Sequence, residues 1–239
     1  MTDPTPTRIE FAPGLSLARI RPPLRLADFR LVAFDMDSTL ISIECIDEIA
    51  EIAGRGAEVA AITEAAMRGE IPDYAESLRR RLALLRGVPE SALERVWKHR
   101  LRLNPGAAEL IAALKAEGLQ VLLVSGGFTY FTERLQHRLG LDRARANELV
   151  IEDGRLTGEV KGEIVDAEAK ARTVLTMCAD IGCEARQAIV VGDGANDLAM
   201  MRVAGLSVAY RAKPKVRAVA DVAIDTGGLD RLLELFQGV

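Results

Sequence analysis

Two aspartates follow a short apolar run directly, and their spacing suits acid–base or metal chemistry. Asp35 and Asp37 come after Leu31 to Phe34, a run typical of a strand buried on both faces. Because side chains alternate along an extended chain, both carboxyls can project to the same side at the strand's end. Like charges held close repel, so the pair requires a metal ion or a shared proton. The simpler alternative is a solvated strand end with a Ser-Thr helix cap.

Two further polar clusters also stand at the ends of apolar runs of strand length. One follows Leu119 to Val124 and the other follows Gln187 to Val191. The first cluster is Ser125, Gly126 and Gly127, and the second contains Asp193, Asn196 and Asp197. In parallel sheets, ligands bind beyond the carboxyl ends of the strands. The topology is therefore expected to gather these clusters with the aspartate pair at one edge of the sheet.

These residue types favour phosphoryl chemistry with a hard cation. Several carboxylates from two loops suit Mg²⁺, which usually also binds a substrate phosphate. A Ser-Gly-Gly turn before a helix offers backbone N–H groups, a hydroxyl and the helix dipole to a phosphate. Lys170 is the leading candidate for a further positive charge, although other lysines are equally available and most only solvate a face. One aspartate could then attack phosphorus while the other moves protons.

Other features exclude several classes of protein. Neither His99 nor His137 has a motif around it, which disfavours a Ser–His–Asp hydrolase, and no phosphate-binding loop of the G-x-x-x-x-G-K-[ST] type is present. The net charge of −4 argues against nucleic acid as a partner. The three cysteines lack C-x-x-C spacing, and no apolar run is long enough to span a membrane. We expect a cytoplasmic protein.

The elements that must position these residues alternate between strand and helix. This pattern predicts an α/β fold with a doubly wound, mostly parallel sheet and helices on both faces. Glu148 to Val160 predicts a β-hairpin that turns at Asp153-Gly154, while only helical patterns lie between Ile41 and Leu103. We therefore expect an N-terminal extension at 1–29, a catalytic core at 30–45 and 104–239, and a helical cap at 46–103.

Four motifs in order resemble those of the haloacid-dehalogenase-like (HAD) superfamily, and more narrowly the phosphoserine phosphatases. They are D-M-D-S-T-L at Asp35, S-G-G-F at Ser125, Lys170, and G-D-G-A-N-D at Gly192. Further similar stretches are I-E-C-I-D-E-I-A at Ile43, E-A-A-M-R-G-E at Glu64, S-L-R-R-R at Ser77 and A-Y-R-A-K-P-K at Ala209. The resemblance spans about Arg30 to Phe236 and implies a Rossmann-like core with an inserted cap.

The resemblance implies a role for each matching residue of the core. Asp35 would be the nucleophile and Asp37 the general acid and base. Mg²⁺ would be held by the Asp35 carboxylate, the Asp37 backbone carbonyl and Asp193, with Asp197 in support. The residues implied to hold the phosphoryl group are Ser125, Gly126 and Lys170, with Asn196 at the phosphate side of the site.

The same resemblance implies that the cap recognises a small substrate, O-phospho-L-serine. Its hydrolysis is the last step of serine biosynthesis. Glu44 would pair with the substrate ammonium and Arg81 with its carboxylate, while Met67 and Tyr74 would line the pocket. Without the resemblance, Glu44 and Arg81 are solvated helix residues. The alternatives are phosphotransfer to homoserine, hydrolysis of another small phosphomonoester, or a binding module without turnover, which Asp37 disfavours. The sequence allows a monomer or a homodimer.

Overall fold

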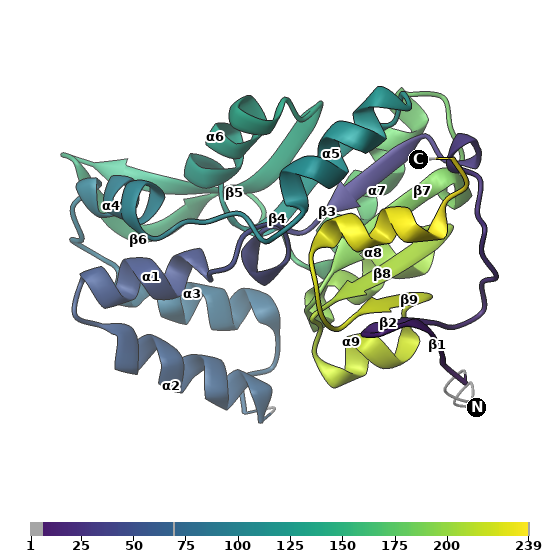
Figure 1. The fold of residues 1–239 in the computed structure, drawn as a ribbon. Helices are drawn as coiled ribbons and strands as arrows, with labels where there is room; N and C mark the ends of the chain where they lie inside the picture. Colours follow the sequence, from purple (N-terminus) through teal and green to yellow (C-terminus); the bar gives the residue numbers. More distant parts are fainter. Residues whose placement is uncertain (1–6, 69, 239) are drawn as a thin grey trace.

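A nine-stranded sheet forms the centre of the molecule (Figure 1). The computed structural model describes residues 7–68 and 70–238. The strands follow the order β1-β2-β9-β8-β7-β3-β4-β5-β6 across the sheet. Their bounds are β1 (Ile9–Ala12), β2 (Leu15–Leu17), β3 (Leu31–Phe34), β4 (Gln120–Phe128), β5 (Arg143–Glu152), β6 (Arg155–Lys161), β7 (Ala188–Gly192), β8 (Leu206–Tyr210) and β9 (Val222–Ile224).

The middle of the sheet is parallel and its two margins are antiparallel. Parallel pairing runs without interruption from β9 to β5. At one margin, β5 and β6 form the predicted hairpin, in which Glu152 pairs with Arg155 across the turn. At the other margin, β1 and β2 extend the sheet beyond β9, because Leu15 and Leu17 are buried there. The prediction of a mostly parallel sheet is thus confirmed, and part of the chain before residue 30 belongs to that sheet.

Helices cover both faces of the sheet, as a doubly wound fold requires. Along β3, Val32 and Phe34 pack into one core and Leu31 and Ala33 into the other. The first core is covered by α5 (Ala107–Ala116), α6 (Thr129–Leu139) and the 3-10 helix η5 (Leu229–Leu235), and the second by α7 (Ala167–Asp180), α8 (Leu198–Val203) and α9 (Pro214–Val219). In the described ranges, no helix is long and apolar enough to cross a membrane.

Four helices follow one another between β3 and β4 and lie to one side of the sheet (Figure 1). They are α1 (Cys45–Ile52), α2 (Gly56–Met67), α3 (Tyr74–Leu84) and α4 (Ser91–His99). The Asp73 carboxylate begins α3 by accepting a hydrogen bond from the N–H of Glu76. The β5–β6 hairpin reaches this layer, since Leu156 exchanges backbone hydrogen bonds with Gly87 and Val88. The hairpin therefore joins the helical layer to the sheet in addition to the chain connection after β3.

The Ser-Gly-Gly segment differs from its predicted conformation. We expected a turn after Val124, but β4 continues in extended form to Phe128 and α6 begins only at Thr129. The pairing of β4 with β5 shifts register between Val124 and Phe128. The reason is tertiary, because the buried Asn147 side chain on β5 donates to the Gly126 carbonyl at 2.7 Å. This contact holds the segment against β5.

Candidate active site

Asp35 lies at the carboxyl end of β3, where the chain turns sharply. Its N–H donates to the carbonyl of Val191 on β7 at 2.9 Å, so the ladder with the neighbouring strand extends to this residue. The following turn, Met36–Leu40, contains Ser38 at a φ of 57°, a left-handed conformation uncommon for serine. The Asp35 side chain is only 4% exposed, and its Oδ1 accepts the N–H of Met36 at 2.8 Å. The carboxyl is thus fixed in a buried position at the sheet edge.

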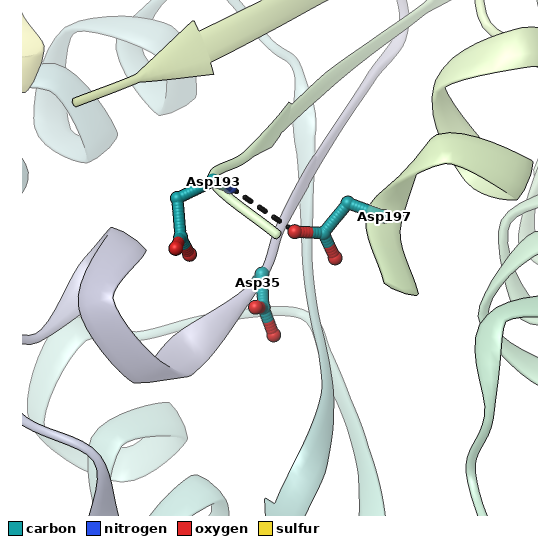
Figure 2. A group of neighbouring side chains, drawn as sticks. All are labelled: Asp35, Asp193 and Asp197. Atoms are coloured by element: carbon teal, nitrogen blue, oxygen red, sulfur yellow. Dashed lines mark hydrogen bonds between the residues drawn. The ribbon is translucent and has the colours of Figure 1, made fainter. Parts of the chain in front are cut away.

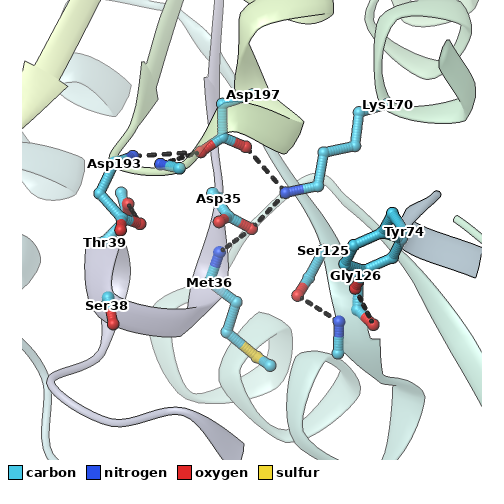
Figure 3. A network of polar contacts seen from close by, with 12 residues as sticks. Asp35, Met36, Ser38, Thr39, Tyr74, Ser125, Gly126, Lys170, Asp193 and Asp197 are labelled. Atoms are coloured by element: carbon cyan, nitrogen blue, oxygen red, sulfur yellow. Dashed lines mark hydrogen bonds and ion pairs between the residues drawn. The ribbon is translucent and has the colours of Figure 1, made fainter. Parts of the chain in front are cut away.

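Lys170 joins two of the predicted carboxylates inside the protein (Figure 3). Its Nζ donates to Asp35 Oδ1 at 2.6 Å and to Asp197 Oδ1 at 2.8 Å, and the lysine is fully buried. Burial alone would lower the pKa of Lys170, but the charges of Asp197 and Asp35 raise it above its ordinary value. The lysine is therefore a fixed cation at the centre of the site. Asp166 caps its helix α7 by accepting the N–H of Ala169.

Asp193 completes a group of three buried carboxylates with Asp35 and Asp197 (Figure 2). One oxygen of each lies within 4.8 Å of the others. Asp193 Oδ1 accepts the hydroxyl of Thr39 at 2.9 Å, while Asp197 Oδ2 accepts the N–H groups of Asp193 and Gly194. Burial and the nearby Asp197 charge raise the pKa of Asp193 to about 6. The cluster is electrostatically short of positive charge, even beside Lys170.

The donor set fits a hard divalent cation. Both Asp197 oxygens are already used by Lys170 and by backbone N–H groups. By contrast, Asp35 Oδ2 and Asp193 Oδ2 accept no hydrogen bond from any residue that the structure describes. Few protein oxygens and room for water are what Mg²⁺ requires. Asp35 and Asp193 can therefore ligate such an ion, while Asp197 supports them from behind.

Asp37 lies beside the cation site in a different environment. The N–H of Cys45 donates to its Oδ1 at 3.0 Å. A Cβ atom at Gly127 would stand 2.7 Å from Asp37 Oδ2, so this carboxyl reaches the end of β4 and requires glycine there. Burial and the nearby Glu44 charge raise the pKa of Asp37 to about 7. Such a carboxyl can both donate and accept a proton near neutral pH.

The end of β4 offers polar atoms next to these carboxyls (Figure 3). The N–H of Gly127 donates to the buried Ser125 hydroxyl at 2.8 Å. The Tyr74 hydroxyl donates to the Gly126 carbonyl at 3.1 Å, and a Cβ atom at Gly126 would clash with that hydroxyl at 2.1 Å. The close approach explains why glycine is needed at this position. Helix α3 therefore meets the predicted phosphate-binding segment through Tyr74.

The three consecutive arginines of α3 differ in their surroundings. Arg79 and Arg80 are exposed and lie within 4.0 and 2.7 Å of Glu76. Arg81 is half-buried, and the one hydrogen bond described for its side chain runs from Nε to the Ser77 carbonyl at 3.4 Å. Its two terminal nitrogens have no partner among the described residues. Of the three, Arg81 alone has no carboxylate within 4.0 Å among the described residues.

The remaining predicted residues lie nearer to solvent. Glu44 is exposed and accepts the Ser38 hydroxyl at 2.7 Å, and desolvation by the surrounding protein raises the pKa of its carboxyl. Asn196 is half-buried in the turn after β7, beside Gly194. Met67 is 69% exposed at the end of α2. The structure thus gathers the core residues closely and leaves Met67 outside the buried cluster.

Three buried polar residues that support the site were not among the predicted ones. Thr39 holds Asp193, as described above. Asn104 donates from Nδ2 to the carbonyls of Thr39 and Ile41 and so fixes the turn after Asp35. Asn147 holds Gly126 through Nδ2 and accepts the N–H of Val165 through Oδ1 at 2.8 Å. Thr39 lies inside the first motif and could have been found there, but the two asparagines have no sequence signal, since their contacts are long-range.

The fold and the site define a class of protein. The family model for haloacid dehalogenase-like hydrolases matches residues 32–202, and the chain belongs to this family. It is 61% identical over 236 residues to a phosphoserine phosphatase of Albidiferax ferrireducens, covering 97% of this chain and 99% of that protein.

Solved structures agree with this membership. One, described as a phospho-aspartyl intermediate analogue of phosphoserine phosphatase, matches with a TM-score of 0.82 at 40% identity over 87% of this chain and 99% of the other. A substrate-bound phosphoserine phosphatase complex matches with the same score, identity and coverage. The expected HAD-like core is confirmed.

Proposed function

We propose that the chain hydrolyses O-phospho-L-serine to L-serine and phosphate through an aspartyl-phosphate on Asp35. The observation that carries the proposal is the buried contact of Lys170 with Asp35, beside Asp37 with a pKa of about 7. A fixed carboxylate, an adjacent proton carrier and a fixed cation are what such a displacement needs. The 61% identity to a phosphoserine phosphatase over almost the whole chain supports the choice of substrate.

In the first half-reaction, the Asp35 carboxylate attacks the phosphorus atom. The bond between phosphorus and the serine oxygen breaks, and protonated Asp37 gives its proton to that oxygen. The phosphoryl oxygens are held by the Lys170 ammonium, the Ser125 hydroxyl and the Gly126 backbone, with Asn196 at the same side. Donors fixed before the reaction stabilise developing charge without reorganisation.

In the second half-reaction, Asp37 acts as a base. Its carboxylate takes a proton from a water molecule that attacks the phosphoryl group, and the bond to the Asp35 oxygen breaks. Phosphate leaves and both aspartates return to their starting states. The pKa of about 7 suits this double role, because neither protonation state is far from the working pH.

Mg²⁺ is the proposed cofactor, held by the Asp35 carboxylate, the Asp37 backbone carbonyl and Asp193, with Asp197 in support. When bound, it neutralises negative charge on the phosphate and the carboxylates. The two partnerless oxygens of Asp35 and Asp193 support this assignment. Their raised pKa values indicate the same need for a cation.

The helical layer, residues 46–103, is proposed to act as a cap that recognises the substrate. Glu44 would bind the ammonium group and Arg81 the carboxylate, as a bidentate pair that fixes orientation. Met67 and Tyr74 would line the pocket. The half-buried Arg81 without a terminal partner supports this role, and the exposed Met67 has room to become covered. Because all three cysteines are free in the structure, we place the reaction in the cytoplasm, at the last step of serine biosynthesis.

A substrate panel tests the proposal. The purified protein with Mg²⁺ should show a higher kcat/KM for O-phospho-L-serine than for O-phospho-L-threonine, sugar phosphates or p-nitrophenyl phosphate, measured as phosphate released. Omitting and then adding homoserine as an acceptor separates hydrolysis from phosphotransfer. A preference for another monoester, or phosphate that is recovered on homoserine, would replace the proposed reaction with one of its alternatives.

A further inference from the structure

One acidic side chain of the helical layer has a buried oxygen without a partner. Asp47 lies in the first turn of α1, three residues after Glu44, and α1 packs against α3. Its Oδ1 is buried and accepts no hydrogen bond from any described residue. Leaving a buried carboxylate oxygen unsatisfied costs free energy, more than for a neutral group. The donors that could reach this oxygen therefore determine its role.

The positive charge that Asp47 senses is Arg81. Burial raises the pKa of the Asp47 carboxyl, and the Arg81 guanidinium opposes this effect by lowering it. The two side chains form no ion pair within 4.0 Å, although they come from packed helices. Arg81 in turn uses only Nε, on the Ser77 carbonyl, in the described contacts. An unpaired acceptor and unpaired donors thus lie near each other without bonding.

We propose that Asp47 is a positioning residue for Arg81, and through it for recognition of the substrate carboxylate. The guanidinium has five N–H donors in a planar fork. Ser77 accepts the Nε–H in the structure, whereas in the substrate complex Asp47 would accept one terminal N–H and the outer pair would face the substrate carboxylate. When the substrate carboxylate binds, Arg81 would lie between that carboxylate and Asp47. Arg81 would then also donate a hydrogen bond to the buried Asp47 Oδ1. This role rests on the proposed function.

Glu44 is the other residue that Asp47 could serve. The two acids lie three residues apart at the start of α1, and the Asp47 charge adds to burial in raising the pKa of Glu44. A like charge, however, gives Asp47 no hydrogen-bond donor and cannot satisfy its buried oxygen. Arg81 can, because its terminal nitrogens are free donors. The geometry therefore favours Arg81, and a double-mutant cycle can separate the two partners.

The test compares Asp47→Asn with Glu58→Gln, which removes an exposed acid in the first turn of α2. Steady-state kinetics are measured with Mg²⁺ on O-phospho-L-serine and on p-nitrophenyl phosphate, which has neither ammonium nor carboxylate. We expect Asp47→Asn to raise KM for phosphoserine about tenfold with kcat within about twofold, which corresponds to about 1.4 kcal/mol. KM for the aryl phosphate should stay within about twofold, and in Glu58→Gln KM should stay within about twofold for both substrates.

The cycle combines Asp47→Asn with Arg81→Ala and, separately, with Glu44→Gln. If Asp47 acts through Arg81, the substitution adds less than about twofold to KM in the Arg81→Ala background and its full effect in the Glu44→Gln background. Asp47→Ala, with a melting temperature matched to the parent, should repeat the pattern. Full additivity with Arg81→Ala, or equal loss on both substrates, overturns the proposal.

The wild-type protein keeps this failure distinct from a failure of the proposed function. A wild type that does not prefer phosphoserine overturns the function itself. A wild type that prefers phosphoserine, with an Asp47→Asn variant that keeps its KM, leaves the function intact and rejects only the positioning role.

Discussion

The core half and the cap half of the site differ in how completely they are formed. In the core half, Lys170, Asp35 and Asp197 are buried and bonded to one another. In the cap half, Arg81 and Asp47 lie near each other without pairing, and Met67 is exposed. Catalytic groups act best when they are positioned before the substrate binds, whereas recognition groups can remain unpaired until the bound ligand supplies their partners. The difference suggests that chemistry resides in the core and selection in the cap.

The largest expected effect follows from Asp35→Asn, which removes the nucleophile from the core half. We expect kcat to fall by about 10⁴-fold or more, because an amide does not form the phosphoenzyme. Phosphate should still bind in calorimetry, since Lys170 and Ser125 remain. Asp28→Asn, an exposed acid before β3, is the matched control and should keep full activity. Turnover above about one per cent in Asp35→Asn contradicts the role.

Lys170→Met removes the fixed cation between two buried carboxylates. The free energy of unfolding should fall by about 3–5 kcal/mol, because Asp35 and Asp197 are left buried without their partner. Urea denaturation measures the change. Lys161→Met, which breaks an exposed pair with Glu148, should cost less than about 1 kcal/mol. Equal losses in the two variants would show that the buried network is not preformed.

The metal-free core half should lose stability as the pH rises. The folded-state pKa of Asp193 is about 6, above its ordinary value of 3.8, so the folded protein binds more protons than the unfolded chain in this window. The stability that Asp193 contributes is therefore fully present below its ordinary pKa of 3.8, and it is lost as the pH rises to about 6. From pH 5 to 7 the loss is about 1.4 kcal/mol. Saturating Mg²⁺ should reduce it.

Urea denaturation with chelator and with Mg²⁺ at both pH values measures this loss, and Asp193→Asn is the control. That variant removes the titrating carboxyl, so its stability should depend less on pH. An unfolding free energy that rises from pH 5 to 7 without metal, in the wild type but not in the variant, would contradict the electrostatic picture.

The smallest expected effect concerns the contact that joins the two halves. Tyr74→Phe removes the hydroxyl that donates to the Gly126 carbonyl and should lower the free energy of unfolding by about 1 kcal/mol. KM for phosphoserine should rise only a fewfold. Tyr130→Phe removes a hydroxyl with no hydrogen bond in the described chain, so its stability should match the wild type. A larger loss of unfolding free energy in Tyr130→Phe than in Tyr74→Phe would contradict the assigned role of the Tyr74 hydrogen bond.

The sequence predicted the architecture because strand and helix patterns are local. The polar clusters after β3, β4 and β7 were expected at one edge, and these three strands are neighbours in the sheet. The residues alone made Lys170 the leading candidate among equally available lysines, and the resemblance then selected it. The choice of Arg81 over Arg79 and Arg80 depended on the resemblance. Tertiary packing decides which of these lysine and arginine side chains point into the site, and the spacing of residues in the sequence does not contain that information.

The conformation of the β4 end could not be predicted for the same reason. Ser-Gly-Gly alone favours a turn, but Asn147 on the neighbouring strand holds the segment in extended form. Asn104 likewise fixes the turn after Asp35 from a distant part of the chain. These contacts form only once the strands are side by side.

The division between the halves is tested most directly by one ratio, kcat/KM for O-phospho-L-serine over kcat/KM for p-nitrophenyl phosphate. It is measured in the wild type and in Arg81→Ala under the same Mg²⁺ concentration. A charge-assisted bond to the substrate carboxylate predicts that the variant's ratio falls about 10- to 100-fold while the aryl phosphate value stays within about twofold. An equal fall for both substrates, or an unchanged ratio, would contradict the assignment of selection to the cap.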